Sequence, residues 1–380
     1  MSSRLKPSLV GQVQFSNWTG DRQLRHPSFQ GLREDKPARK VVRDDPISPK
    51  AIVSTNEATA VAKTKRTPGA EKSRRAQARV APPANEIAGV ALSHPDKVLY
   101  PEDGYTKLDL ARYYVEAAPW MLPHVENRLL SLVRCPAGSG KKCFFQKHPG
   151  GGTSDVLDRF DVDESDGVEE YLAVTDVAGL IALVQMGVLE IHIWGSQADR
   201  FEKPDRLILD LDPDPSVKWP QVVAAAKEVK LLLEELGLES FIKTTGGKGL
   251  HIAVPIQRRT DWDDAKTFCR AVADFLVAAA PDRYIAKMSK AARKGKIFVD
   301  YLRNDRGATA VAPYSTRAKV GAPVSVPITW DELSSKLKSD HFTIKNLPAR
   351  LAKLKKDPWA GIAQVKQSIT ASMLKRLQAR

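Results

Sequence analysis

The sequence contains little cysteine and no long apolar run. Its three cysteines, Cys135, Cys143 and Cys269, form no C-x-x-C pair, so we expect neither a zinc knuckle nor a disulfide framework. No apolar stretch approaches the roughly 20 residues of a membrane span, and the N-terminus lacks the apolar core of a signal peptide. These absences predict a chain of the reducing cytoplasm that has no membrane partner.

An excess of acidic residues is also absent. The chain carries 59 Lys and Arg residues against 45 Asp and Glu residues, a formal net charge of +14. Residues 1–85 hold 17 basic and 7 acidic side chains, which accounts for +10 of that charge. A basic chain predicts polyanion partners, although on charge alone a merely soluble basic surface is a nearly equal alternative.

Composition divides the chain into three parts. Residues 1–36 contain short alternating stretches typical of a small β fragment, too short to bury a core alone. Residues 37–85 are rich in Ala, Lys, Arg, Thr and Pro and predict a disordered basic linker. Residues 86–380 mix strands and helices without strict βαβ alternation, which predicts an α+β or mixed α/β fold. We expect helices from Thr106 and over 176–186, 220–236 and 262–280, and strands over 128–133, 142–146, 189–194, 240–244, 250–254, 296–302 and 309–312.

Three carboxylates follow or end apolar stretches. Asp210 and Asp212 alternate along one strand and therefore share a face, and Pro213 then predicts an exposed strand end. Asp300 closes the apolar run from Ile297. Together the three acids would complete a two-metal site, with ions about 3.5–4 Å apart. The alternative is an acidic turn and a solvated strand end.

A glycine-rich turn between two predicted strands is a second candidate site. In the stretch from Thr245 to His251, backbone N–H groups can face a phosphate while Lys248 adds charge. The stretch is not a P-loop, because Ile242 replaces the first glycine and Gly249 stands where Ser or Thr is required. A plain hairpin turn is the alternative.

The remaining candidates each have an ordinary structural explanation. His192 lies in an apolar strand, where a core histidine is the usual case. Phe144 and Phe145 point to opposite faces of a strand, so one ring is expected in the core and the other could stack on a base. Arg293 and Arg317 are most simply surface charges.

Six blocks in this order resemble the polymerase domain of bacterial ligase D, a member of the archaeo-eukaryotic primase superfamily. The resemblance covers residues 86–380 and implies a primase-polymerase-like fold with mixed sheets flanked by helices. The blocks begin at His94, Phe144, Ile208, Thr245, Phe298 and Ala312 and read HPDKVLYP, FFQK, ILDLDP, TGGKGLH, FVDY and APYSTR.

The resemblance implies a DNA-dependent nucleotidyltransferase that fills gaps and extends ends in bacterial non-homologous end joining. It further implies two divalent metal ions, manganese or magnesium, and a preference for ribonucleotides. The implied partners are DNA gaps or ends with a 5′-phosphate, NTP or dNTP, a Ku homodimer and a separate ligase domain or protein. Two rival functions remain at this point, a non-catalytic DNA-end-binding module and a metal-dependent nuclease or phosphatase.

The resemblance also implies roles for individual residues. Metal ligands are Asp210, Asp212 and Asp300, and His192 belongs to the active site. The incoming nucleotide is held by Thr245, Lys248, His251 and Arg317, although Thr245 stands where the family often has Ser. The DNA-binding residues are Lys97 and Lys107, which contact the 5′-phosphate, and Phe144 and Phe145, which stack at the template. The two lysines flank the helix start at Thr106, whose free N–H groups are expected to favour an anion.

The leader has a resemblance of its own. Residues 15–36 are similar to the last piece of the ligase OB domain that precedes the polymerase in many ligase D chains. The chain contains no Lys-x-Asp-Gly nucleotidylation motif. We therefore expect an OB remnant at 1–36 that has no ligase activity.

Overall fold

The computed structural model describes residues 86–165 and 167–379, together with the backbone of four short leader segments at 11–14, 17–18, 24–25 and 28–32. The chain divides into two compact units, Met1–Ala78 and Arg79–Arg380. The expected linker at 37–85 lies outside the described residues.

The leader contains the expected β fragment. Strand β1 (Gly11–Gln14) pairs antiparallel with β4 (Ser28–Leu32), and β2 (Asn17–Trp18) pairs antiparallel with β3 (Leu24–Arg25).

The second unit contains a six-stranded sheet of order β17-β18-β14-β16-β15-β20. Neighbouring strands are antiparallel except β17 and β18, which are parallel, so the sheet is mixed as predicted. The predicted strands of this sheet are found within a few residues of their expected bounds, whereas β17 and β20 were not predicted. The bounds are β14 Arg206–Pro213, β15 Phe241–Thr244, β16 Leu250–Pro255, β17 Tyr284–Ile285, β18 Ile297–Asp300 and β20 Pro327–Ile328.

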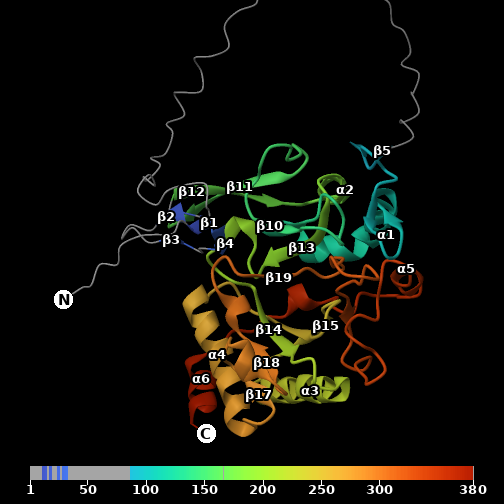
Figure 1. Cartoon of the computed structure of the whole chain (residues 1–380). Helices are drawn as coiled ribbons and strands as arrows, with labels where there is room; N and C mark the ends of the chain where they lie inside the picture. Colours follow the sequence, from blue (N-terminus) through green and yellow to red (C-terminus); the bar gives the residue numbers. More distant parts are fainter. Residues whose placement is uncertain are drawn as a thin grey trace, which may run out of the picture. The chain divides into compact units, whose positions relative to one another are not determined.

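Alternation along β14 assigns its two faces. Leu207, Leu209 and Leu211 are buried in the main core, on the face covered by helices α3 (Trp219–Glu235) and α4 (Trp262–Ala279). Asp210 and Asp212 point to the opposite face because side chains alternate along a strand. Figure 1 shows both helices beside β14 and β18, which leaves the acidic face for a site.

A four-stranded antiparallel sheet of order β10-β9-β13-β19 forms the other half of this unit. Helix α1 begins at a capping box between Thr106 and Asp109 and packs against α2, which contacts β13. The bounds are α1 Lys107–Val125, β9 Leu130–Arg134, β10 Phe144–Gln146, α2 Val177–Gln185, β13 Val188–Trp194 and β19 Thr309–Val311.

Short elements complete the unit. The β11–β12 hairpin was not predicted, whereas the helical pieces near the C-terminus were. Their bounds are β5 Glu86–Ile87, β6 Val90–Ala91, β7 Val98–Tyr100, β8 Tyr105–Thr106, β11 Asp158–Glu164, β12 Gly167–Ala173, α5 Leu347–Leu351 and α6 Ala371–Gln378.

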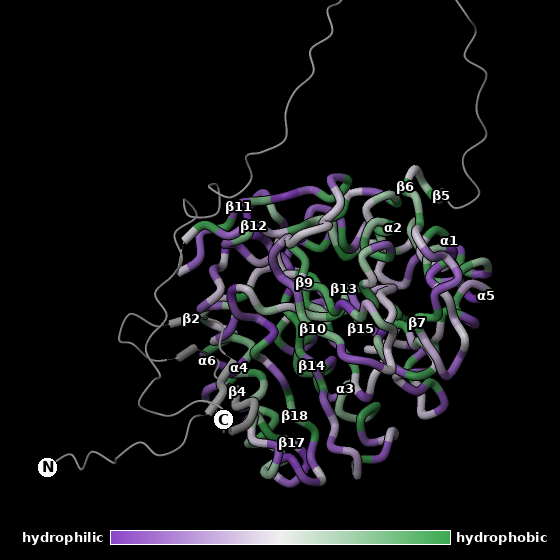
Figure 2. The backbone as a smooth tube through the Cα atoms, turned by 45° about the horizontal axis from the view of Figure 1, so that its top comes forward, coloured by the Kyte–Doolittle hydropathy of each residue, from purple (hydrophilic) through white to green (hydrophobic). Residues whose placement is uncertain are grey.

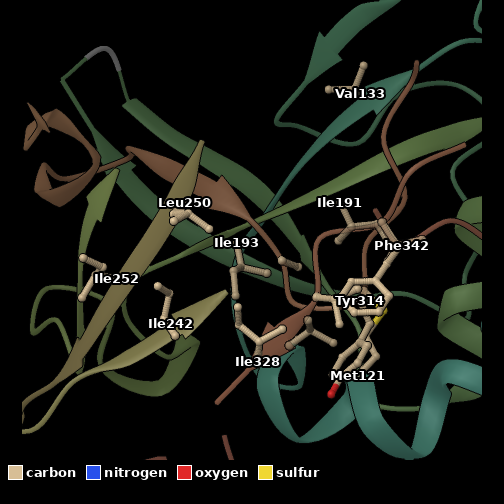
Figure 3. Packing of buried hydrophobic residues seen from close by; sticks show 14 of the residues in the cluster. Met121, Val133, Ile191, Ile193, Ile242, Leu250, Ile252, Tyr314, Ile328 and Phe342 are labelled. Atoms are coloured by element: carbon tan, nitrogen blue, oxygen red, sulfur yellow. The ribbon is translucent and has the colours of Figure 1, made fainter. Parts of the chain in front are cut away.

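One hydrophobic cluster joins the two sheets. Ile191 and Ile193 of β13 belong to the same buried cluster as Ile242 of β15 and Leu250 of β16 (Figure 3). The apolar colour follows the central strands and the hydrophilic colour follows many outer loops (Figure 2). The sheets are therefore packed as one body, and a residue on β13 can contribute to a site on β14. Within the described part of the chain, no helix combines the length and the apolar character needed to cross a bilayer.

No disulfide framework was expected from the sequence, yet the described residues contain a disulfide. Cys135 and Cys143 are bonded, with their Cα atoms 4.3 Å apart. Cys135 directly follows β9 and Cys143 directly precedes β10, and the pairing of Phe144 with Arg134 brings these two ends together. A rule based on C-x-x-C spacing misses this bond because strand pairing, not sequence proximity, makes the two cysteines neighbours.

Candidate active site

The acidic residues meet at the centre of the six-stranded sheet. Asp210 is paired with Asp300 on one neighbouring strand and with His251 on the other. The two carboxylate residues are each 8% exposed. The expected exposure at this strand end was wrong for Asp210, because pairing continues to Pro213, opposite Ile297, and so encloses Asp210 within the sheet. The Asp212 side chain remains 38% exposed.

An arginine that the sequence did not single out lies between the two buried acids. Nε of Arg303 is 3.4 Å from Oδ2 of Asp210 and 3.2 Å from Oδ2 of Asp300. Burial opposes the charge of Asp210, but His251, Arg303 and Lys243 outweigh it and hold the pKa of this carboxyl well below its usual range. Burial raises the pKa of Asp300, and the charge on Asp210 adds to this effect. The pair is therefore a pocket of negative charge that already attracts a cation.

Asp212, on the same face, is held by two other cations. Its carboxylate lies 3.2 Å from Nη1 of Arg293 and 3.7 Å from Nζ of Lys248. No group of three or more His, Cys, Asp or Glu side chains in residues 86–165 and 167–379 is gathered tightly enough to hold a metal ion. The oxygen donors of Asp210 and Asp300, which flank a guanidinium, fit a hard divalent cation. Asp212 would join them by leaving Arg293 and Lys248.

His251 is a neutral partner of the buried acid. Its Nε2 lies 3.3 Å from Oδ2 of Asp210, and its Nδ1 is buried without a hydrogen-bond partner among the described residues. Burial and the nearby charge of Lys243 lower the pKa of His251 to about 4, although Asp210 opposes this shift. The ring is therefore uncharged at pH 7 and donates to Asp210 as a neutral group.

The glycine-rich turn joins β15 and β16 as a hairpin, as predicted. The Thr245 hydroxyl donates to the Gly249 carbonyl at 3.0 Å and accepts from the Gly247 N–H at 3.2 Å. A Cβ on Gly249 would lie 2.0 Å from the Leu211 carbonyl oxygen, so only glycine fits against β14. Lys248 remains 55% exposed at the tip, where it is available to an anion.

Glu190 is a site residue that the sequence reasoning missed. One of its oxygens lies 2.9 Å from Nε2 of His192 and 3.1 Å from Nε of Arg317, and the other accepts the Ala318 N–H at 2.9 Å. Burial opposes its charge, but His192 and Arg317 outweigh that effect and lower the pKa of Glu190 to about 2. The sequence contained an indication of this role, because Glu190 and His192 are two positions apart on one strand and therefore share a face.

Several of these groups line a cleft of about 180 Å³ between the two sheets, whereas Asp300, Arg293 and Glu190 are not part of its lining. Seven of the predicted residues line it, together with Arg303 and Lys319, which were not predicted. His192 is therefore a cleft residue rather than a simple core histidine. The seven are His192, Asp210, Asp212, Thr245, Lys248, His251 and Arg317.

The two phenylalanines lie outside the core. Phe144 is 44% and Phe145 is 68% exposed, because β10 is an edge strand of the four-stranded sheet. The expectation that one ring would be buried was therefore wrong. The ring centroid of Phe145 lies 5.8 Å from that of His192, so this ring borders the cleft. The guanidinium of Arg134 lies over the Phe144 ring at 5.6 Å.

The two lysines near the start of α1 lie outside the cleft lining. Lys97 is exposed, whereas Lys107 is 6% exposed and donates to the Ser93 carbonyl at 2.8 Å and to the Gln185 amide oxygen at 3.2 Å.

The expectation of free N–H groups at this helix start was wrong. The Thr106 and Asp109 N–H groups are paired within the capping box. The Lys107 N–H donates to the Lys97 carbonyl and the Leu108 N–H donates to the Pro95 carbonyl. Any anion at this end must therefore be held by side chains.

Residues 106–359 match the family model described as LigD, primase-polymerase domain, and residues 2–36 match that of the ATP dependent DNA ligase C terminal region. The chain is 38% identical over 374 residues to the multifunctional non-homologous end joining protein LigD of Pseudomonas aeruginosa. These residues are 98% of this chain and 42% of that protein. A bifunctional LigD of Bacillus subtilis is 30% identical over 259 residues, which are 68% of this chain and 42% of that protein. The chain thus spans less than half the length of either relative.

A solved structure has the same fold. The polymerase domain from Mycobacterium tuberculosis ligase D, in complex with DNA, matches with a TM-score of 0.68 and 31% identity. The match covers 72% of this chain and 98% of that domain. The primase-polymerase fold expected from the sequence is thereby confirmed.

Proposed function

Because the chain belongs to the LigD primase-polymerase family, a family of nucleotidyltransferases, we propose that it adds nucleotides to DNA primers at gaps and ends. We assign this activity to bacterial non-homologous end joining, the process after which its relatives are named. A Ku homodimer and a separate ligase domain or protein are the proposed partners. The leader, which matches a ligase C-terminal region, is proposed to have no ligase activity.

The observation that carries the proposal is the opposition of Asp210 and Asp300 beside a cationic cleft. Both acids lie on adjacent strands and face one shared cation, Arg303. With Asp212 they would hold two divalent ions, manganese or magnesium, which when bound activate a primer 3′-hydroxyl and neutralise phosphate charge. The protein supplies position and fixed charge rather than a covalent nucleophile.

The part of the cleft around the glycine-rich hairpin, beside the acids, is proposed to hold the incoming nucleotide. Lys248 is the more exposed cation there, and Arg317 is fixed by Glu190 and by the Thr245 carbonyl at 2.6 Å. Positive groups at these positions suit a triphosphate. His251 would add a neutral ring beside these cations, and we propose that ribonucleotides are preferred.

The DNA contacts are proposed to lie outside the cleft. Exposed Phe144 and Phe145 offer ring faces to template bases, and Phe145 borders the cleft beside His192. Lys97 and Lys107 would contact a 5′-phosphate through their ammonium groups. Because Lys107 already donates to two acceptors, Lys97 has the larger free capacity.

Primer extension on a gapped duplex tests the proposal. Ribonucleotides and deoxyribonucleotides are each supplied with manganese or magnesium, and the primer length is measured. Longer primers are expected with the wild type, and shorter primers would indicate a nuclease. Binding without extension under every condition would leave only a DNA-end-binding module.

Binding to the gap tests the two lysines separately. We expect affinity for gapped DNA to fall when the 5′-phosphate is removed, and to fall less in a Lys97→Ala variant. Equal affinity of the wild type for both DNAs would overturn this assignment.

A further inference from the structure

A second and larger cavity lies at the opposite end of β14 from the acids. Its volume is about 390 Å³, and four of its lining side chains are cations, Arg128, Arg206, Arg258 and Lys366. Asp205 is the one acid in the lining. Both oxygens of that acid are already engaged by the Arg128 guanidinium at 2.7 Å each. The cavity therefore has a strong excess of positive charge.

Arg206 is the unusual member of this lining. The residue is 7% exposed, yet its guanidinium has no hydrogen bond or ion pair with any residue in the described part of the chain. The Trp359 ring covers it at 5.5 Å. A buried charge is normally paired because its desolvation is costly. An unpaired guanidinium at a cavity wall is therefore a place for an external anion.

The charge on this group persists at neutral pH. Burial lowers the pKa of Arg206 to about 9, and the nearby Arg128 contributes in the same direction, whereas the charge of Asp205 opposes the shift. The Arg258 guanidinium forms an ion pair with Asp199, which is not a lining residue, with Nη2 2.7 Å from Oδ1. Arg206 and the exposed Lys366 thus have no ion-pair partner among residues 86–165 and 167–379, which suits an anion of more than one negative charge.

The cavity is separate from the catalytic cleft. Arg206 and Asp210 share a face of β14, but they are four positions apart, or about 13 Å along a strand. The two cavities have no lining residue in common. A triphosphate bound beside Asp210 would therefore leave Arg206 unpaired.

We propose that this cavity binds a phosphate group, carried by a mononucleotide or by a nucleic-acid strand. The planar fork of Arg206 can donate two parallel hydrogen bonds to phosphate oxygens. Lys366 supplies a second charge at the exposed side, and the Gln257 amide offers a further polar contact. The proposal does not depend on the polymerase activity.

Inorganic phosphate is the first probe, titrated calorimetrically into the full chain. Lys248→Ala is used as background so that phosphate in the catalytic cleft contributes little. Arg206→Met in that background is expected to weaken phosphate binding at least tenfold. Arg259→Met is the matched control, because that arginine is exposed and outside the lining, and a change below twofold is expected. Unchanged affinity in Arg206→Met would overturn the proposal.

Thermal unfolding without phosphate separates binding from structure. Removing an unpaired buried charge should leave the Tm unchanged or raise it. A lower Tm for Arg206→Met would assign the guanidinium a structural role against Trp359 and would count against a ligand site. Should this variant not fold, Arg206→Lys replaces it, since it keeps the charge but loses the fork. Wild-type affinity in Arg206→Lys would then overturn the proposal.

Competition identifies the source of the phosphate. A nucleoside triphosphate and a single-stranded oligonucleotide are each added to the phosphate complex in the Lys248→Ala background. Displacement by the triphosphate that depends on Arg206 assigns a mononucleotide, and displacement by the oligonucleotide alone assigns a strand. If neither displaces phosphate, the cavity does not take a phosphate ester and the proposal is wrong.

Discussion

The Glu190 carboxylate lies 2.9 Å from Nε2 of His192, and the same oxygen lies 3.1 Å from Nε of Arg317. Burial lowers the pKa of His192, whose ring is therefore neutral at pH 7 and donates from Nε2 to the carboxylate. One buried acid thus sets the orientation of two cleft side chains. We regard Glu190 as a positioning residue, because it acts through His192 and Arg317.

Glu190→Gln should weaken nucleotide binding while the fold is kept. The amide preserves volume but loses the charge that holds Arg317, so the KM for nucleotide is expected to rise about tenfold, or roughly 1.4 kcal/mol. The kcat should change less than the KM. Steady-state primer extension measures both. Glu234→Gln, on the exposed side of α3, is the control and should match the wild type. An unchanged KM would remove the positioning role.

Asp300→Asn should separate activity from stability. Because burial raises the pKa of Asp300, its charge is disfavoured in the folded protein, and a neutral amide should keep the free energy of unfolding within about 1 kcal/mol. Extension should fall at least about 100-fold, because an oxygen proposed to bind metal is lost. Asp210 is a poorer choice, because its buried charge balances Arg303 and its carboxylate also contacts His251.

Urea unfolding and primer extension measure the two effects of Asp300→Asn. Asp274→Asn on α4, an exposed acid paired with Arg270, is the control. Extension at the wild-type rate by Asp300→Asn would contradict the two-metal assignment.

Gly249→Ala should destabilise the hairpin that carries Lys248. The new methyl would lie 2.0 Å from the Leu211 carbonyl oxygen, so the turn must move away from β14. We expect a loss of about 2 kcal/mol in the free energy of unfolding and weaker nucleotide binding. Gly151→Ala is the control, because nothing lies within 4 Å of its Cβ position. Equal unfolding midpoints in urea for the two variants would contradict this account.

Stability should fall between pH 7 and pH 5. The pKa of His251 is about 4 in the folded chain, against about 6.5 when unfolded, so the unfolded state binds the proton first as the pH falls. This residue alone should remove about 2 kcal/mol over that range. The pKa values of His192 and His124 are also lowered by burial and act with the same sign.

Urea unfolding of the wild type and of His251→Gln at pH 7, 6 and 5 measures this contribution. The variant should lose less stability than the wild type across the same range. Parallel losses in the two proteins would show that His251 is not the group that titrates.

Reduction of the disulfide should lower stability. The Cys135–Cys143 bond closes a short loop with a sequence separation of 8, for which chain entropy predicts about 2.5 kcal/mol. Thermal unfolding with and without dithiothreitol measures the loss. Cys143→Ser should be as unstable as the reduced protein and indifferent to the reagent. Equal stability of oxidised and reduced wild type would show that the bond contributes nothing.

The sequence was informative where local pattern decides the structure. Alternation placed Asp210 and Asp212 on one face, and the Thr106 signal placed the start of α1. Local pattern gave wrong predictions where pairing between distant segments determines the structure. The burial of Asp210 depends on strands on both sides, and the Cys135–Cys143 bond depends on the β9–β10 register. The role of Arg303 could not be predicted from the sequence, because the short 3-10 helix η5, Leu302–Asn304, places its side chain beside the acids.

The cleft beside Asp210 takes one wall from each sheet. His192 belongs to the four-stranded sheet, whereas Lys248 and His251 belong to the hairpin of the six-stranded one. A nucleotide bound to both walls would oppose separation of the two sheets, because the sheets can separate only after the nucleotide dissociates. At a concentration of 100 times the dissociation constant, mass action adds about 2.7 kcal/mol against that separation. Saturation with nucleotide should therefore slow amide exchange in β13 and β16 together.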